Sequence, residues 1–180
     1  MQFNIFYFVF IFILNFSCSN SYNEKSINNG KTILDYHANK LMNPSIRILK
    51  KNNLVAIATS DSLIRADESE AILIGNVKSK FFDKNDLVST LFSDSGIIKD
   101  GSERMEAFGN VKLIGKDSVI LFSNKLIWDN QYKIVFSDDS VMFKNQDNDT
   151  LYGVGFESDI NLSNWKIFNP IGVTHKNESK

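Results

Sequence analysis

Short apolar stretches and polar, turn-forming clusters follow one another along the chain from Leu54 onward. Within the stretches, apolar and polar side chains alternate, as is typical of β-strands that bury one face. Residues 87–92 and 107–113 are examples of the first and second strands that these stretches predict. The separating clusters are rich in residues that favour turns, and they lie at 83–86, 99–102, 129–131 and 145–149. No segment beyond residue 54 keeps a helical period over the length of a helix, so the pattern predicts an all-β domain.

The strand pattern recurs in four units. Each unit opens on one of four similar segments, residues 59–62, 92–95, 122–125 and 156–159, and closes on Val77, Val111, Val141 or Val173. These valines follow short turn-prone pairs and are 34, 30 and 32 residues apart. Two strands per unit predict an open antiparallel β-jellyroll, a twisted roll built from about four two-strand repeats. Because such a roll is open, its edge strands are free to pair with another chain.

Alternation also predicts which side chains face inward. In the second strands, the parity of the closing valine carries Val77, Val111 with Leu113, and Val141 with Phe143, whereas Lys78, Lys112 and Lys144 fall on the opposite parity. In the first strands, the inward sets are Val55, Ile57 and Leu63; Val88, Phe92 and Ile98; Ile120, Phe122, Leu126 and Trp128; and Val154, Phe156, Ile160 and Leu162. Asp61, Asp94, Asn124 and Ser158 interrupt these sets, which predicts a bend or bulge at each.

The N-terminus carries an apolar run, Ile5–Leu14, that ends shortly before Ser17 and Cys18. The run is shorter than the ~20 residues of a spanning helix and suits a secretory signal. The segment resembles a bacterial lipoprotein signal, which implies that Cys18 is acylated and that residues 1–17 are removed. Asn15 and the absence of Lys or Arg at the start depart from that pattern, so an uncleaved membrane anchor remains the alternative. Either reading places the rest of the chain outside the cytoplasm.

The remaining chain divides into a linker and one domain. Residues 18–53 are rich in Asn, Ser and Lys and predict a tether, with one short ordered piece near Ile46–Leu49. Residues 54–175 form the predicted β-jellyroll domain, and residues 176–180 form a tail.

Composition excludes several function classes. The formal net charge is −1 and no Lys/Arg cluster occurs, so we expect no nucleic-acid partner. A single cysteine leaves no intramolecular disulfide and no cysteine-based zinc site. His37 and His175 lack triad or metal-ligand spacing, and residues 147–149 lack the glycine and distal glutamate of a calcium loop. We therefore expect no enzyme activity, with no catalytic site, no metal site and no cofactor.

Several short motifs carry a family resemblance. The Gly-Asn-Val repeats that end at Val77 and Val111, the stretch 126–129 and the segment Gly153–Asp159 resemble the LptC/OstA family of lipopolysaccharide export proteins. The resemblance covers about residues 45–175, and Gly153–Asp159 looks most like LptC, the membrane-anchored periplasmic member. It implies a twisted β-jellyroll with an apolar slit, and a periplasmic location at the inner membrane. Familiar members use a spanning helix, whereas this sequence offers Cys18 as a lipid anchor.

The resemblance also implies a function and partners. The slit would accept lipopolysaccharide acyl chains from an inner-membrane ABC transporter and pass them to an LptA/OstA-like periplasmic roll paired edge to edge. The candidate slit residues are the apolar side chains of the inward parity: Val77, Phe92, Val111, Leu113, Phe122, Leu126, Trp128, Val141, Phe143 and Phe156. Any one of them can equally be ordinary core. Alternative functions are an OstA-like oligomeric bridge or scaffold, and a structural surface lipoprotein.

Overall fold

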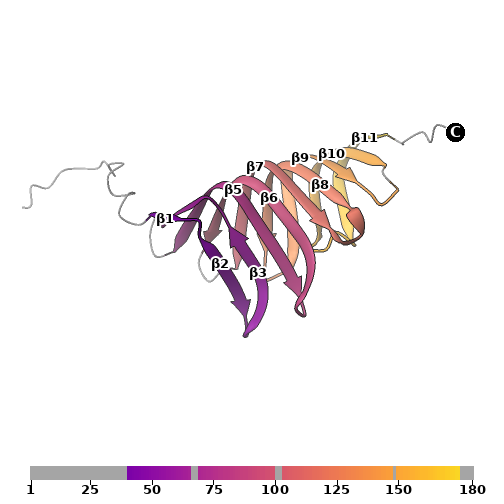
Figure 1. Cartoon of the computed structure of the whole chain (residues 1–180). Helices are drawn as coiled ribbons and strands as arrows, with labels where there is room; N and C mark the ends of the chain where they lie inside the picture. Colours follow the sequence, from indigo (N-terminus) through magenta and orange to yellow (C-terminus); the bar gives the residue numbers. More distant parts are fainter. Residues whose placement is uncertain (1–39, 66–68, 100–102, 148, 175–180) are drawn as a thin grey trace, which may run out of the picture. The chain divides into compact units, whose positions relative to one another are not determined.

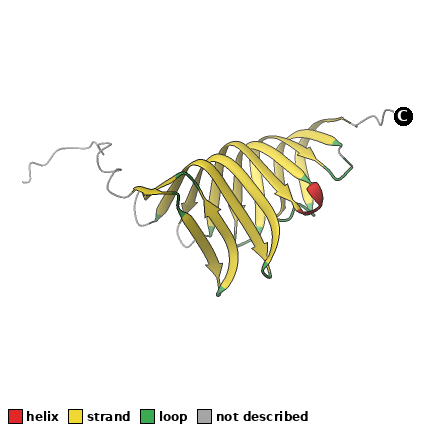
Figure 2. Cartoon of the chain, in the orientation of Figure 1, coloured by secondary structure: helices red, strands yellow, loops and turns green. Residues whose placement is uncertain are grey.

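The computed structural model describes residues 40–65, 69–99, 103–147 and 149–174, and these form one antiparallel sheet (Figures 1 and 2). A single 3-10 turn, η4 (Lys116–Ser118), is the helical element of the described residues. The strands are β1 (Lys40–Met42), β2 (Ser45–Lys50), β3 (Asn53–Thr59), β4 (Ser62–Arg65), β5 (Glu70–Asp83), β6 (Asp86–Lys99), β7 (Arg104–Gly115), β8 (Ile120–Asp129), β9 (Ile134–Lys144), β10 (Thr150–Asp159) and β11 (Trp165–Thr174). The predicted all-β class is confirmed.

The strands follow one another as a meander. From β4 to β11, each strand pairs with the next one in the chain. The first half of β5 pairs with β4 and its second half with β3, and β1 and β2 pair outside β4 and β3. No described strand pairs β11 back to β1 or β2, so the sheet does not close. The predicted open roll, with one free edge at β1 and β2 and the other at β11, is confirmed.

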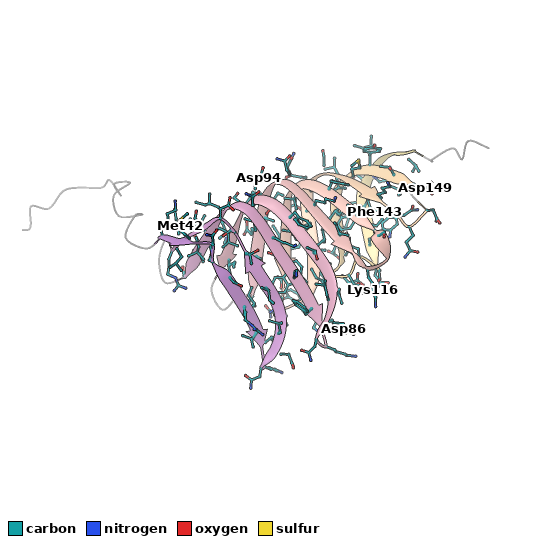
Figure 3. All side chains as sticks on the ribbon, viewed as in Figure 1. Met42, Asp86, Asp94, Lys116, Phe143 and Asp149 are labelled. Carbon is teal, nitrogen blue, oxygen red and sulfur yellow. The ribbon has the colours of Figure 1, made fainter. Side chains whose placement is uncertain are left out.

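A row of bulges bends the sheet into two walls. The pairing register shifts near the middle of each long strand, between residues 74 and 77, 92 and 95, 108 and 111, 123 and 127, and 154 and 156. Wall A comprises β2, β3 and residues 77–83, 86–93, 111–115, 120–123, 140–144, 150–154 and 169–174. Wall B comprises β1, β4 and residues 70–74, 95–99, 104–108, 125–129, 134–137, 156–159 and 165–167. Figure 3 shows Asp94 at the bend, with Asp86 and Lys116 at hairpin ends away from it.

Glycine, asparagine and aspartate build the bend. Gly109 and Asn110 have φ values of +73° and +46°, in the left-handed region that glycine and asparagine tolerate best. The Asn110 Nδ2 donates to Asp94 Oδ2 on the neighbouring strand at 2.7 Å. Asp61 and Asn76 repeat the same pair at 2.8 Å one repeat earlier. The bends predicted at Asp61 and Asp94 are therefore present, and Asn124 also lies within a register shift.

The bend predicted at Ser158 is wrong. In β10 the register shifts around Gly155, which has a φ of +79°. Ser158 pairs regularly with Val135 and Trp165, and its side chain is buried. The repeat alignment matches Phe156 of the fourth unit to the phenylalanines of the earlier units and therefore predicts the bend at Ser158. The residue that permits the bend is Gly155, directly before Phe156.

The bulges also correct the predicted inward sets. A bulge adds one residue to a strand, so the parity that faces inward changes across it. In β6, Leu91 is buried before the bulge and Ile98 after it, whereas Phe92 is 36% exposed. The sequence prediction keeps one parity on both sides of the bend. It is right for five side chains that face inward: Leu63, Ile98, Leu126, Trp128 and Phe156. It is wrong for five that lie on the outer face: Ile57, Phe92, Ile120, Phe122 and Val154.

The sheet also begins before the predicted boundary at residue 54. Residues from Lys40 onward pair into it, and Ile48 of β2 is buried in the core. The Asn-, Ser- and Lys-rich composition predicts a tether over residues 18–53, but part of this interval forms the edge of the sheet, where few apolar side chains are needed and all three residues of β1 are exposed. The signal peptide 1–17, Cys18 and the tail 176–180 lie outside the described residues and stay predictions. The described part contains no helix with the length and apolarity that a bilayer span requires.

Candidate functional site

The inward side chains of the two walls form one apolar interior. Eight of the ten predicted slit residues lie in it, each at most 5% exposed: Val77, Val111, Leu113, Leu126, Trp128, Val141, Phe143 and Phe156. The other two, Phe92 and Phe122, point outward. Their rings lie under lysines of the outer face, with Lys78 Nζ at 5.4 Å and Lys112 Nζ at 5.7 Å from the ring centroids. The structure therefore separates these two from the slit.

Aromatic contacts join wall A to wall B. The rings of Phe81 and Trp128 lie 5.0 Å apart at an angle of 60°, one from each wall. Phe143 of wall A lies 5.6 Å from Phe156 and 4.5 Å from Trp165, both of wall B. Phe81 is not among the predicted slit residues, although it has the inward parity of Val77, because polar Ser79 lies between them and interrupts the apolar pattern. Its contact with Trp128 makes it part of the candidate site.

The interior opens at the hairpin ends into a cavity of about 200 Å³. Val55, Phe82 and Val88 line it from wall A, and Trp128 and Ile160 line it from the opposite side. Polar residues complete its lining: Asp83, Asn130, Lys133, Asp159 and Asn161. The volume is below the ~300–1,000 Å³ of typical small-molecule sites, so a long apolar ligand would require the walls to part.

Two contacts bring the walls together beside this cavity. Lys50 Nζ, at the end of β2, donates to the carbonyl oxygen of Asn130 at 2.8 Å. Gly115, at the end of β7, lies so close to the β10–β11 turn that an added Cβ would stand 2.7 Å from the Asn161 carbonyl oxygen and 3.1 Å from Leu162 Cβ. Asn130 and Asn161 both line the cavity, so these contacts flank its mouth. Neither contact is part of the strand pairing of the sheet.

Behind Phe81 and Trp128 lies a second, smaller hollow. It is lined by Leu73, Leu91 and Ser79 among others, and Phe81 and Trp128 line both spaces. Within the described residues, the buried hydroxyls of Ser79 and Ser89 have no hydrogen-bond partner. The volume of this hollow is only about 10 Å³, room for no more than about one water molecule, so it belongs to the packed core while the walls are closed.

A charged cluster lies outside the slit, on the outer face of wall B. Glu106 is 8% exposed, and its carboxylate is 3.0 Å from Lys99 Nζ and 3.8 Å from Lys125 Nζ. Arg104 Nε lies 3.2 Å away without hydrogen-bond geometry. Burial raises the pKa of the Glu106 carboxyl, but the hydrogen bond from Lys99 and the charges of the three cations outweigh it and hold that pKa below its ordinary value. Because this pKa is lowered in the folded protein, the ionised Glu106 carboxylate stabilises the fold at neutral pH. That stabilisation is lost as the pH falls through the lowered pKa.

The described residues contain no group of His, Cys, Asp and Glu side chains arranged to hold a metal ion. The candidate site consists of two apolar walls with a partly open mouth between them. Such a site can hold an amphipathic molecule by its apolar part, without any covalent step.

Comparisons with known proteins agree with this geometry. No curated protein matches the chain. Among solved structures, the chain is similar to LptH, described as the LptA-homologous periplasmic component of the lipopolysaccharide transport device of Pseudomonas aeruginosa. The TM-score is 0.52 at 14% identity, over 62% of this chain and 80% of that one, which supports the jellyroll fold. The family described as OstA-like protein matches residues 44–169, nearly the whole sheet, and the chain therefore belongs to the OstA-like protein family.

Proposed function

We propose that this chain is a periplasmic lipid-binding subunit of a lipopolysaccharide export machine and performs no chemistry. It would accept lipopolysaccharide acyl chains from an inner-membrane ABC transporter and pass them to a similar β-roll. The observation that carries the proposal is the apolar interior between two walls, closed at its mouth by a few narrow contacts. The family membership and the similarity to a periplasmic component of lipopolysaccharide transport support it.

The proposal depends on burial of acyl chains in the slit, which binds them strongly but still allows their transfer to another roll. Each methylene removed from water contributes about 0.8 kcal/mol, so ten methylenes hold a chain by about 8 kcal/mol. Escape into water is therefore slow. Passage into a neighbouring roll with a similar interior changes the free energy little. The mouth residues Lys50, Asn130, Gly115 and Leu162 would separate for entry, and Phe81 and Trp128 would separate to admit a chain more deeply.

The two free edges suit pairing with other rolls. Backbone groups on the outer sides of β1, β2 and β11 face no other described strand. Large apolar side chains are exposed along both edges: Leu41, Met42 and Leu49 on one, and Trp165, Phe168, Ile171 and Val173 on the other. Strand addition would join the apolar interiors of two rolls into one path. We propose an LptA/OstA-like roll as the partner at one edge.

The proposed place of the protein is the periplasmic side of the inner membrane, as in LptC. Acylation of Cys18 would attach it there, or else an uncleaved N-terminal segment would. Only the sequence supports this part of the proposal, through the run Ile5–Leu14 and the resemblance of segment 153–159. Two or more acyl chains hold a protein stably on a bilayer, so a lipidated Cys18 would replace a spanning helix.

The second candidate function is an OstA-like oligomeric bridge. The observation that favours it is that both edges are free and carry exposed apolar side chains. A chain of this kind would form edge-to-edge filaments by itself and would not co-purify with a transporter. The leading proposal requires co-purification with transporter components.

Lipid binding in the slit is tested by tryptophan quenching. The two tryptophans are Trp128, 5% exposed, and Trp165, 40% exposed on β11. In a Trp165→Phe variant, a nitroxide-labelled fatty acid should quench most of the remaining emission, because its chain lies against Trp128, and added lipopolysaccharide should reverse the quenching. A matched Trp128→Phe variant, which reports from Trp165, should show weaker quenching, because Trp165 packs on Phe143 at the β11 end of the interior and does not line the cavity. Quenching of Trp165 without quenching of Trp128, or no quenching of either tryptophan in folded protein, would reject the slit as the binding site.

A further inference from the structure

The outer face of wall A carries only positive charge at its centre. Strand register aligns its outward residues in two rows that cross the sheet. The row nearer the bend is Ser45, Thr59, Lys78, Phe92, Lys112, Phe122, Met142, Tyr152 and Gly172. The next row is Arg47, Ile57, Lys80, Thr90, Ile114, Ile120, Lys144 and Thr150. Together they contain five cations and no acidic residue, although the chain has a net charge of −1. We call these two rows the basic face.

The acidic residues are placed elsewhere. Asp61, Asp94, Asp138 and Asp139 lie at the bend, and asparagine amides bind the carboxylates of Asp61 and Asp94. Asp83 and Asp86 lie at the hairpin end of β5 and β6. The outer face of wall B is mixed, and there Glu106 pairs with three cations. Among the described residues, by contrast, no carboxylate lies within ion-pair distance of a cation of the basic face.

Apolar and aromatic side chains lie between the cations. Lys78 lies over the ring of Phe92 and Lys112 over that of Phe122, so the lysine stems lie along aromatic surface. Phe92 is 36% exposed and Tyr152 is 41% exposed. A shallow groove of about 520 Å³ lies on this face, lined by Lys112, Phe122, Met142, Tyr152 and, nearer the bend, Asn110, Ser123, Asn124 and Ser140. The face is therefore a broad sheet surface on which positive charge and half-exposed apolar groups alternate.

We propose that the basic face lies flat against the surface of an anionic lipid bilayer. Lysine and arginine attract anionic headgroups, and aromatic and aliphatic side chains enter the interfacial region. A protein partner is the less favoured occupant, because protein interfaces usually deplete lysine in their core, and here four of the five cations are lysines. The proposal goes beyond lipid carriage in the slit. It orients the roll on the membrane, with the outer face of wall B turned away from it.

The test uses the whole chain with one reporter thiol. In Cys18→Ser, which removes the native cysteine, Thr90→Cys places an environment-sensitive dye at the middle of the basic face. Glu157→Cys places the same dye on the exposed outer face of wall B as the matched control. The vesicles contain equal parts of phosphatidylcholine and phosphatidylglycerol, or phosphatidylcholine alone, and acrylamide is the aqueous quencher. The N-terminal apolar run is present in both proteins and contributes equally.

The proposal predicts that anionic vesicles protect the dye at position 90 from acrylamide at least about threefold, and that high salt removes this protection. The dye at position 157, and both dyes with neutral vesicles, should show little change. Replacing Lys78, Lys80, Lys112 and Lys144 by Gln should abolish the protection. Replacing Lys40, Lys51, Lys84 and Lys166 by Gln removes the same charge elsewhere and should retain it.

Three results would overturn the proposal: equal protection at both positions, protection that survives loss of the four face lysines, or shielding of position 90 by soluble acidic proteins but not by anionic vesicles. Circular dichroism of each variant shows whether the sheet is intact. Quenching of Trp128 by a labelled fatty acid is measured without vesicles. Failure of membrane docking and failure of slit binding are therefore distinguishable.

Discussion

Phe143→Ala is expected to lower the free energy of unfolding by about 3–5 kcal/mol, because truncating a fully buried aromatic ring is among the most costly single changes in a core. Phe143 is completely buried and contacts Phe156 and Trp165 across the interior. Truncation removes the ring from the contact between the walls and leaves a cavity that the stiff sheet cannot fill. Urea denaturation followed by circular dichroism measures the change.

Phe168→Ala is the matched control for this prediction. Phe168 lies on β11 and is 49% exposed, so its truncation should change stability by at most about 1 kcal/mol. A similar, small loss for both variants would mean that the walls are not packed together around Phe143. The slit would then be an open trough in the free protein.

Gly109→Ala is expected to cost about 2–4 kcal/mol, because two penalties act together. The φ of Gly109 is +73°, where a Cβ costs about 1–2 kcal/mol. The added Cβ would also stand 2.5 Å from Asp94 Oδ2, which must move and break its hydrogen bond to Asn110. Loss of that bond adds about 1 kcal/mol or more. The same denaturation experiment gives the value.

Two further variants identify the origin of that cost. Gly172→Ala is the control, since a Cβ there meets nothing within 4 Å and its effect should be close to zero. In an Asp94→Ala background, Gly109→Ala should lose the clash with the carboxylate and the hydrogen-bond term but keep the backbone penalty and a tight contact with the Cβ of residue 94 at 3.0 Å, so its cost should fall by about 1 kcal/mol. A Gly109→Ala variant as stable as the parent would show that the Gly-Asn pair does not set the bend.

The sequence predicted the fold well because the repeat and the alternation are local signals. Val111 and Leu113 alternate with Lys112, and the structure places these valine and leucine side chains inward as expected. Alternation failed only where a bulge changed the parity. Leu91 and Phe92 are both apolar neighbours, and only the position of the bulge decides that Leu91 faces inward and Phe92 outward.

The candidate site was harder to predict because it depends on contacts between distant segments. Lys50 and Asn130 are 80 residues apart, and nothing in either segment indicates that they meet. Phe81 became a site residue only through its contact with Trp128 of the opposite wall. The basic face depends on strand register, since its five cations come from β2, β5, β7 and β9. The repeat and the alternation place Lys78, Lys112 and Lys144 on the outward parity, but only the strand register shows that these lysines line up in two rows with Arg47 and Lys80.

The central claim is that acyl chains lie between the walls and not on the outer face. A photo-crosslinking scan along β7 with lipopolysaccharide tests it most directly, because this strand crosses both walls and its bulge changes the inward parity. We predict crosslinks from Met105, Ala107, Val111 and Leu113, which face inward, and none from Phe108, Lys112 and Ile114, which face outward. Crosslinks of equal yield at both sets, or from the outward set alone, would contradict the account.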